Sequence, residues 1–354
     1  MKKIISTSIT ALLLTAAGAS ADTYFFSGNG TDFDNVSNWY KITSESSPWT
    51  NKSMPQGKER PLYTDSYTGE KLNNSYTYAN ATQMPTANDD IVFGIYYFAE
   101  QDKTENAKFP ALKNSITVKN FLTRTHGSPK FILGNSDESA AGSEFIFKTG
   151  EDLLSAYDNS IDFTIDANAK QSAFRMQIGG KINSFTDNTK YANFGSASRG
   201  FDSIEAGSVV ANIHYNFFAK KLIVSGDFTY GSKLKNEKRT SSFNFIDLKD
   251  GEVAVSIDGK LSKSEDYKIN LDFTNANLGE GESYTLIGAG SVEGFDLTDY
   301  TKDFNLIGID DADIKSLAWN GNSLVLTTAV PEPAAIAAVL GAIALGFAAY
   351  RRRK

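Results

Sequence analysis

The sequence predicts an all-β protein, and two observations lead to that prediction. Segments in which apolar and polar residues alternate with the period of a β-strand are frequent, and no stretch of useful length has the period of a helix. Turn signals made of Gly, Asn and Asp separate these segments. This pattern favours an irregular β-solenoid similar to a parallel β-helix, with a β-sandwich as the alternative.

The composition indicates a folded chain with a real core. Of the 354 residues, 41% are hydrophobic, and the 24 Phe and 16 Tyr favour strands. The absence of cysteine excludes disulfides and thiolate-held metals. The formal net charge is −7 although both ends of the chain are cationic, so the body is more acidic than the whole. An acidic body argues against nucleic acid as a partner.

Residues 1–21 have the three parts of a secretory signal peptide. Lys2 and Lys3 form a short cationic start, and an apolar stretch of helical preference follows. Ala19 and Ala21 are the small residues that a signal peptidase reads. We therefore expect cleavage by signal peptidase and a mature chain that begins near Asp22.

Residues 22–110 are expected to form an N-terminal polar cap region of strands and loops. From about Trp39 to Pro85 this region is rich in Ser, Thr, Asn, Tyr and Pro, and its alternation is weak. Exposed tyrosines there would offer a surface for stacking on sugar rings, although core or loop packing is the commoner role of tyrosine. The candidates are Tyr63, Tyr67, Tyr76 and Tyr78.

Residues 111–329 are expected to form the β-rich body. Asp250-Gly251, Asp258-Gly259 and Asn320-Gly321 are predicted turns. The last of these predicts a hairpin, because the alternating segments 317–319 and 324–326 flank it. Four segments alternate cleanly enough to predict strands: Ile161–Ile165, Phe174–Ile178, Val253–Ile257 and Ile269–Phe273.

Residues 330–354 form a tail of three parts. Pro331, Glu332 and Pro333 come first, and residues 334–350 are then uncharged and apolar. As a helix this run would be about 25 Å long, just short of a bilayer core, and it is predicted to be a single transmembrane helix. The closing cations would stay cytoplasmic under the positive-inside rule. They are Arg351, Arg352, Arg353 and Lys354.

This tail resembles the PEP-CTERM sorting domain of Gram-negative bacteria. The matching residues are Val330 to Pro333, the apolar run and Arg351 to Arg353. The resemblance implies that an exosortase, a membrane transpeptidase-like enzyme, recognises Pro331, Glu332 and Pro333 and cleaves near them. It further implies a surface or matrix component linked to exopolysaccharide, which becomes an expected partner. Segments 221–229 and 281–287 loosely resemble rungs of autotransporter-type passenger domains.

The tail and the signal peptide together predict a route for the chain. The precursor would be anchored in the inner membrane, with its body outside and its C-terminus in the cytoplasm. Processing would then place the protein on the cell surface or in the extracellular matrix.

Acidic clusters in the body do not form a convincing active or metal site. Asp89 and Asp90 are adjacent, and neighbouring residues of a strand point to opposite faces, so their carboxylates would not converge. Asp310, Asp311 and Asp313 offer oxygens to calcium but lack the glycine turn and distal Glu of an EF-hand loop. A solvated acidic turn is the preferred interpretation.

The two histidines are expected to be structural. His126 lies in a turn-like segment, and His214 is expected to face outward from a strand. Neither is accompanied by a Gly-x-Ser-x-Gly elbow, and no phosphate-binding loop or dinucleotide fingerprint is present. We therefore expect no catalytic residue, no metal and no cofactor.

The leading functional hypothesis is a non-enzymatic structural or adhesive protein of the cell surface or matrix. The alternatives are an extracellular polysaccharide-acting enzyme and a carbohydrate-binding module, each on a β-helix. Acidic and basic side chains that converge in one groove would favour the enzyme. A flat exposed row of aromatic rings would favour the binding module.

Overall fold

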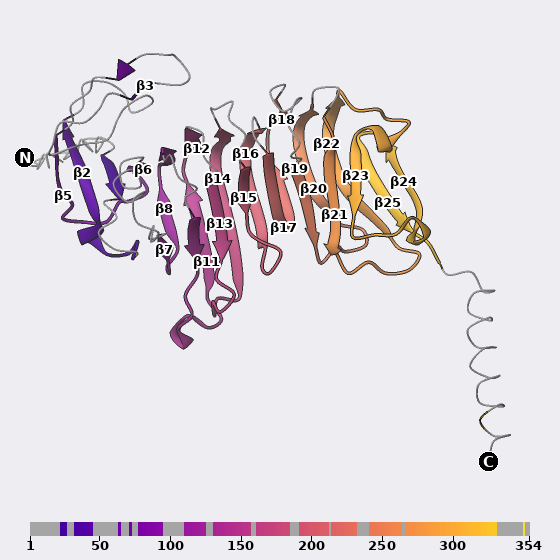
Figure 1. The fold of residues 1–354 in the computed structure, drawn as a ribbon, viewed down its shortest axis with the longest axis horizontal. Helices are drawn as coiled ribbons and strands as arrows, with labels where there is room; N and C mark the ends of the chain where they lie inside the picture. Colours follow the sequence, from indigo (N-terminus) through magenta and orange to yellow (C-terminus); the bar gives the residue numbers. More distant parts are fainter. Residues whose placement is uncertain are drawn as a thin grey trace, which may run out of the picture.

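The computed structural model confirms the all-β prediction (Figure 1). It describes residues 22–26, 32–44, 63–64, 71–72, 77–94, 110–124, 130–156, 161–184, 191–211, 214–231, 241–263, 267–330 and Tyr350. Helical structure in these residues is confined to short 3-10 turns and to the single residue Tyr350. The turns are η1 (Val36–Asn38), η3 (Glu138–Ala140), η5 (Tyr300–Lys302) and η6 (Asp311–Asp313).

Three columns of parallel strands run along the long axis of the molecule. Column A comprises β1 (Thr23–Phe26), β6 (Asp90–Gly94), β9 (Asn120–Arg124), β12 (Leu153–Ala156), β18 (Phe228–Tyr230) and the C-terminal parts of β14 (Ala173–Ser184), β16 (Phe201–Ala211), β20 (Val253–Ser262) and β22 (Ser283–Glu293).

Column B consists mainly of strand segments that directly precede those of column A in the sequence. It comprises β8 (Ile116–Val118), β11 (Glu144–Thr149), the N-terminal parts of β14, β16, β20 and β22, and the C-terminal part of β17 (His214–Val224). Its last members are antiparallel: β25 (Ser323–Thr328) pairs with β22, and β24 (Ile314–Asn320) pairs with β25.

Column C completes the set. It comprises β7 (Ala111–Leu112), β10 (Lys130–Leu133), β13 (Ile161–Ile165), β15 (Tyr191–Phe194), the N-terminal part of β17, β19 (Ser241–Ile246), β21 (Ile269–Asn275) and β23 (Phe304–Ile307). Near the N-terminus, β2 (Trp39–Ser44) and β5 (Thr77–Asn80) extend β1 in antiparallel fashion, and β3 (Tyr63–Thr64) pairs with β4 (Lys71–Leu72).

The chain passes through columns C, B and A in turn, and one such passage is called a coil below. Hydrogen-bonded side chains of successive coils are 23 residues apart at Asn193 and Asn216, and 35 apart at Asn270 and Asn305. Because the coil length varies so widely, no strict repeat is visible in the sequence. Parallel pairing of this extent does not fit the β-sandwich alternative, whose sheets are antiparallel.

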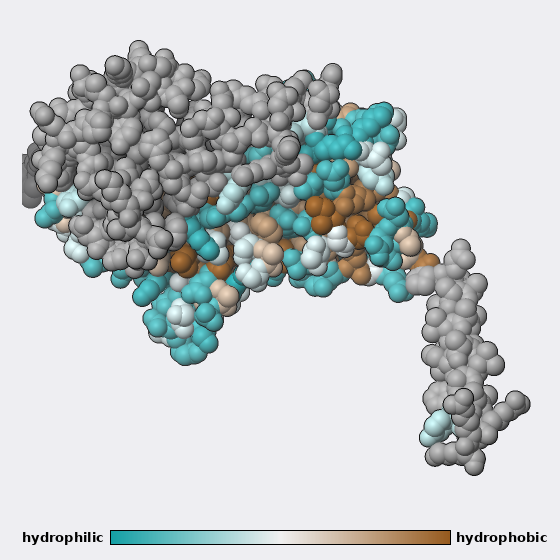
Figure 2. Space-filling model, in the orientation of Figure 1, coloured by the Kyte–Doolittle hydropathy of each residue, from teal (hydrophilic) through white to brown (hydrophobic). Residues whose placement is uncertain are grey.

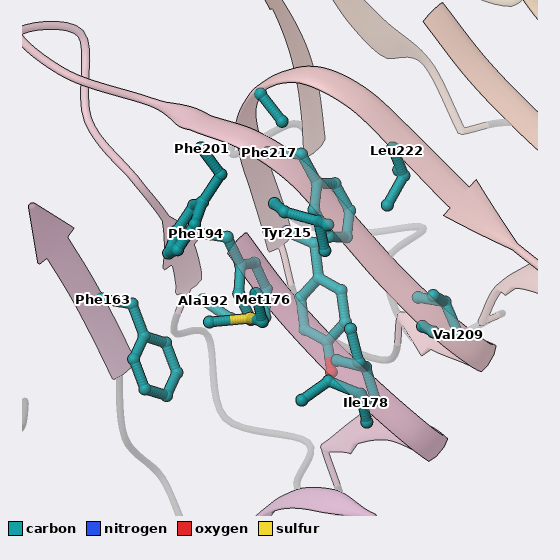
Figure 3. Close-up of a cluster of buried hydrophobic side chains, with 14 of the residues drawn as sticks. Phe163, Met176, Ile178, Ala192, Phe194, Phe201, Val209, Tyr215, Phe217 and Leu222 are labelled. Carbon is teal, nitrogen blue, oxygen red and sulfur yellow. The ribbon is translucent and has the colours of Figure 1, made fainter. Parts of the chain in front are cut away.

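The core between the columns is apolar and strongly aromatic (Figure 3). Phenylalanines from successive strands of column C occupy one register position and stack on one another. Ring centroids are 5.0 Å apart at Phe194 and Phe217, where the planes differ by 9°. The stack consists of Phe131, Phe163, Phe194, Phe217 and Phe243, all buried. Alternation in the sequence therefore reflects inward-facing aromatic and aliphatic side chains.

Glycines line the corner between columns B and A. A Cβ atom added to Gly207 would lie 2.6 Å from the carbonyl oxygen of Gly180, and one added to Gly226 would lie 2.6 Å from that of Gly207. Neither glycine needs a left-handed backbone; close approach of one coil to the next excludes a side chain. The glycines at this corner are Gly150, Gly179, Gly180, Gly207, Gly226, Gly259 and Gly290.

Half-buried polar side chains form a ladder on the outer face of column C. Asn216 donates from Nδ2 to Oδ1 of Asn193 at 2.7 Å, and Asn305 donates from Nδ2 to Oδ1 of Asn270 at 3.1 Å. The register row is Asp162, Asn193, Asn216, Ser242, Asn270 and Asn305. Each rung thereby satisfies polar groups and opposes a shift in register.

All four segments predicted to be strands from their clean alternation are confirmed. Ile161–Ile165 is β13, and the other three segments lie within β14, β20 and β21. The hairpin is confirmed, because β24 and β25 pair across Asn320 and Gly321, and Gly321 has a φ of +61°. The turn at Asp258-Gly259 is wrong: both residues lie inside β20, where the strand crosses the glycine corner.

The two targeting segments lie outside the described residues. Residues 1–21 and the predicted transmembrane helix, apart from Tyr350, are not described. Among the residues that are described, no helix combines the length and apolar character needed to cross a bilayer. The boundaries at residues 22–110 and 111–329 remain predictions.

Candidate binding groove

A shallow groove lies at the corner between columns C and B. Its volume is about 140 Å³, and it is bordered by β16, by the middle of β17 and by the connection from β19 to β20. The groove-lining residues are Asp202, Lys220, Lys221, Asp247, Leu248, Lys249, Glu252, Val253 and Ala254. Charged side chains from three coils thus converge on a small depression with apolar residues in its lining.

Two ion pairs span neighbouring strands of the groove. Lys220 Nζ lies 2.9 Å from Asp202 Oδ1, and Lys221 Nζ lies 2.8 Å from Glu252 Oε2. All four side chains keep between 31% and 46% of their surface exposed, so these pairs add little stability. The hydrogen bond and positive charge of Lys221 lower the pKa of Glu252, which stays ionised at neutral pH. Glu252 is therefore suited to accept hydrogen bonds and unsuited to act as a general acid.

The connection from β19 to β20 is held in place by backbone hydrogen bonds to the next coil. Asp247 N donates to Asn275 O at 3.2 Å, and Leu248 N donates to Ala276 O at 3.0 Å. Asp247 has a φ of 52°, in the left-handed region that Asp tolerates better than most residues. The predicted turn at Asp250-Gly251 is confirmed here, and Gly251 has a φ of +75°.

The apolar part of the groove comes from three side chains. Leu248 and Ala254 are buried, whereas Val253 is 38% exposed. A Cβ atom on Gly288, the glycine of the neighbouring strand, would lie 3.3 Å from Val253 Cγ1, so the absence of a side chain there leaves room for Val253. Figure 2 shows apolar residues exposed among hydrophilic ones on the visible face of the C-terminal half.

The structure places His214 differently from the sequence prediction. His214 begins β17 but is 1% exposed, so the expectation of an outward-facing side chain is wrong. Its Nδ1 atom lies 3.3 Å from the Tyr267 hydroxyl, which also donates to Ser241 Oγ at 2.9 Å. Burial raises the pKa of Tyr267, so its hydroxyl stays neutral. A packed polar cluster covers this histidine.

Asp89 and Asp90 are both buried and, as predicted, serve separate partners. Asp89 Oδ2 accepts hydrogen bonds from the backbone and hydroxyl of Thr86 at 2.8 and 2.7 Å. Asp90 Oδ1 accepts one from Asn120 Nδ2 at 2.9 Å. Burial raises the pKa of Asp90, and the hydrogen bond from Asn120 opposes that shift.

Asp310, Asp311 and Asp313 lie in an exposed turn around η6. Within the described part of the chain, no three His, Asp or Glu side chains are arranged to hold a metal ion.

The structure does not describe the side chains of the remaining predicted residues. His126, Tyr67 and Tyr76 lie outside the described residues, and Tyr63 and Tyr78 are described only as parts of β3 and β5. Both cleavage segments and the sorting motif are also undescribed, namely Ala19, Ala21, Pro331, Glu332, Pro333, Arg351, Arg352, Arg353 and Lys354.

Sequence reasoning did not find the groove. Its residues come from three separate coils, and their convergence depends on coil lengths that the sequence does not reveal. The adjacent Lys220 and Lys221, followed by an acidic turn at residues 247–252, were the available signal.

Comparisons with known proteins give no relative. No protein-family model, curated protein or solved structure matches the chain. Inferences about function therefore rest on the residues and their geometry.

Proposed function

We propose that the chain is an exported, non-enzymatic structural or adhesive protein of the cell surface or extracellular matrix. In this proposal the three strand columns are the faces of an irregular β-solenoid. The supporting observation is the in-register parallel pairing of β13, β15, β17 and β19 in successive coils around one aromatic core. Stacked-repeat proteins of this kind provide long, rigid surfaces for binding.

The chemistry of the described residues supports a role without catalysis. A general acid needs a pKa near the working pH, whereas the pKa of Glu252 is lowered by Lys221. His214 is buried and contacts the Tyr267 hydroxyl, so its ring is not open to solvent. Outward-facing charges such as Arg175 and Glu144 are paired with each other across strands, with Arg175 Nε 3.0 Å from Glu144 Oε1.

The proposed location at the cell surface rests on the predicted signal peptide, residues 1–21, and on the predicted sorting tail, residues 330–354. Signal peptidase and an exosortase-type enzyme are the proposed processing partners, with Pro331, Glu332 and Pro333 as the recognised motif. Terminal peptide mapping of the protein recovered from the surface fraction of its own bacterium tests this. We expect a first residue near Asp22 and a last residue near Pro331 to Pro333. Persistence of peptides through Tyr350 would contradict sorting by cleavage.

The groove also favours a second candidate, a polysaccharide-acting enzyme. Acidic and basic side chains do converge there, as that function requires. Glu252→Gln and Asp202→Asn variants should abolish turnover of a polysaccharide substrate if the groove is catalytic. The non-enzymatic proposal expects no turnover by the unmodified chain in the same assay.

A further inference from the structure

We propose that the groove binds a carboxylate-bearing sugar residue, a uronic acid, of a polysaccharide chain. This inference rests on the proposed surface function and names the ligand class of the groove. It starts from the Lys249 ammonium group, which forms no ion pair with any described residue. Lys249 is exposed, and its charge helps to lower the pKa of Glu252. A carboxylate ligand would give this ammonium group a direct charge-assisted hydrogen bond.

Three ammonium groups surround a depression of about 140 Å³. The groove lining also includes Asp202, Asp247 and Glu252, so the lining carries no net charge. Lys249 is the one lysine of the lining without a carboxylate partner among the described residues, and it is the group that a ligand carboxylate would contact. Lys220 and Lys221 are bonded to Asp202 and Glu252 in half-exposed pairs, which cost little to rearrange. The lysines can therefore turn toward a bound carboxylate or hydroxyl without loss of a buried contact.

The acidic side chains suit the hydroxyl groups of a sugar. Ionised Glu252 accepts hydrogen bonds, and sugar hydroxyls are donors as well as acceptors. Asp247 forms no side-chain hydrogen bond or ion pair among the described residues and lies at the same rim as Lys249. A ligand with both hydroxyls and a carboxylate satisfies this mixture of charges better than a simple anion does.

The apolar residues and the size of the groove further restrict the kind of ligand that it can bind. Leu248, Val253 and Ala254 offer a surface for the C–H face of a pyranose ring. The volume is well below the roughly 300–1,000 Å³ of typical cofactor and drug sites. We therefore infer that the depression holds a single ring of the chain and that the neighbouring rings lie outside it.

Binding of hexagalacturonate to the full chain, purified in a zwitterionic detergent, tests this inference. Titration calorimetry would compare it with maltohexaose, a neutral oligosaccharide of the same number of rings. We expect hexagalacturonate to bind, to bind more weakly as salt screens the lysines, and to outcompete maltohexaose by at least about tenfold. Equal binding of the two sugars, or no binding of hexagalacturonate, would overturn the proposal.

A matched pair of lysine variants assigns the binding to the groove. Lys249→Gln should weaken hexagalacturonate binding by about tenfold or more, since one charge-assisted hydrogen bond is lost, and Lys249→Arg should restore most of it. Lys113→Gln removes the same charge from an exposed position at the other end of the body and should change binding less than about twofold. Unchanged denaturation curves for all three variants show that the fold is intact.

An unaffected Lys249→Gln variant would place the binding elsewhere and reject the groove. Absence of sugar binding combined with correct termini in the surface fraction would reject this inference and leave the proposed function standing.

Discussion

The ammonium group of Lys263 lies 2.8 Å from Oδ1 of Asp303, and both side chains are almost wholly buried, at 0% and 3% exposed. The second oxygen of Asp303 accepts a hydrogen bond from Asp296 N at 2.6 Å, and the Lys263 ammonium lies 5.2 Å from the centre of the Phe295 ring. A buried ion pair of this kind fixes the end of β20 to the segment before β23.

Removal of one partner should be costly, because the other charge is left buried. We expect Lys263→Met to lower the free energy of unfolding by about 3–5 kcal/mol, measured by urea denaturation. Lys260→Met is the control, since its pair with Glu293 is largely exposed, and it should cost less than about 1 kcal/mol. Equal losses in the two variants would contradict this account of the pair.

Gly207→Ala tests the glycine corner. Its new methyl group would lie 2.6 Å from Gly180 O, so we expect a loss of about 1–3 kcal/mol in unfolding free energy from forced separation of coils. Gly150→Ala is the matched control, because its Cβ atom would meet nothing closer than 3.9 Å. That variant should be neutral or slightly more stable in the same denaturation experiment.

Phe194→Ala tests the aromatic stack. The ring is buried between Phe163 and Phe217, so its removal should cost about 3–5 kcal/mol in chemical denaturation. Leu297→Ala removes a side chain that is 47% exposed and should cost less than about 0.5 kcal/mol. A small loss for Phe194→Ala would mean that the stack tolerates a cavity and does not hold the coils together.

Asp162→Asn tests the ladder through its pH dependence. Burial raises the pKa of Asp162 above its ordinary value, although hydrogen bonding from Asn193 and the charge of Lys130 oppose the shift. The folded state then binds this proton more tightly than the unfolded state, so stability falls as pH rises from about 3.8 through the folded pKa. At pH 7 the carboxylate of Asp162 is ionised, and the free energy of unfolding is lowered by the full cost of burying that charge.

Asparagine at position 162 removes that penalty and retains an oxygen for Asn193. We expect the variant to be more stable than the natural chain at pH 7, with the difference disappearing below pH of about 3.8. Urea denaturation at pH 7 and pH 3 measures it, with exposed Asp258→Asn as the control. A pH-independent difference would show that the charge of Asp162 is irrelevant.

Local structure could be predicted from the sequence where one face of a strand is buried. Ile161–Ile165 alternates because Ile161, Phe163 and Ile165 face the core and the residues between them do not. The hairpin at Gly321 was predictable for the same reason, together with its turn residues. In both cases the signal lies within a few residues of the structure that it specifies.

Features that depend on contacts between coils could not be predicted in this way. Asp258-Gly259 has the composition of a turn, yet Gly259 is required because Gly226 of the previous coil approaches it closely. His214 has the sequence surroundings of an exposed strand residue, yet it is buried and contacts Tyr267, which lies 53 residues further along the chain. The groove needs Lys220, Glu252 and Asp202 from different coils.

The strand columns have a mechanical consequence. Hydrogen bonds between parallel strands are directed across the strands, and here that direction follows the long axis of the molecule (Figure 1). Tension applied between the two ends of the described body acts along these hydrogen bonds. The bonds between one pair of coils would therefore break before those between the next pair. Each step releases a coil of about 23 to 35 residues, and a surface-held body of this design would dissipate a pull in small increments before it breaks.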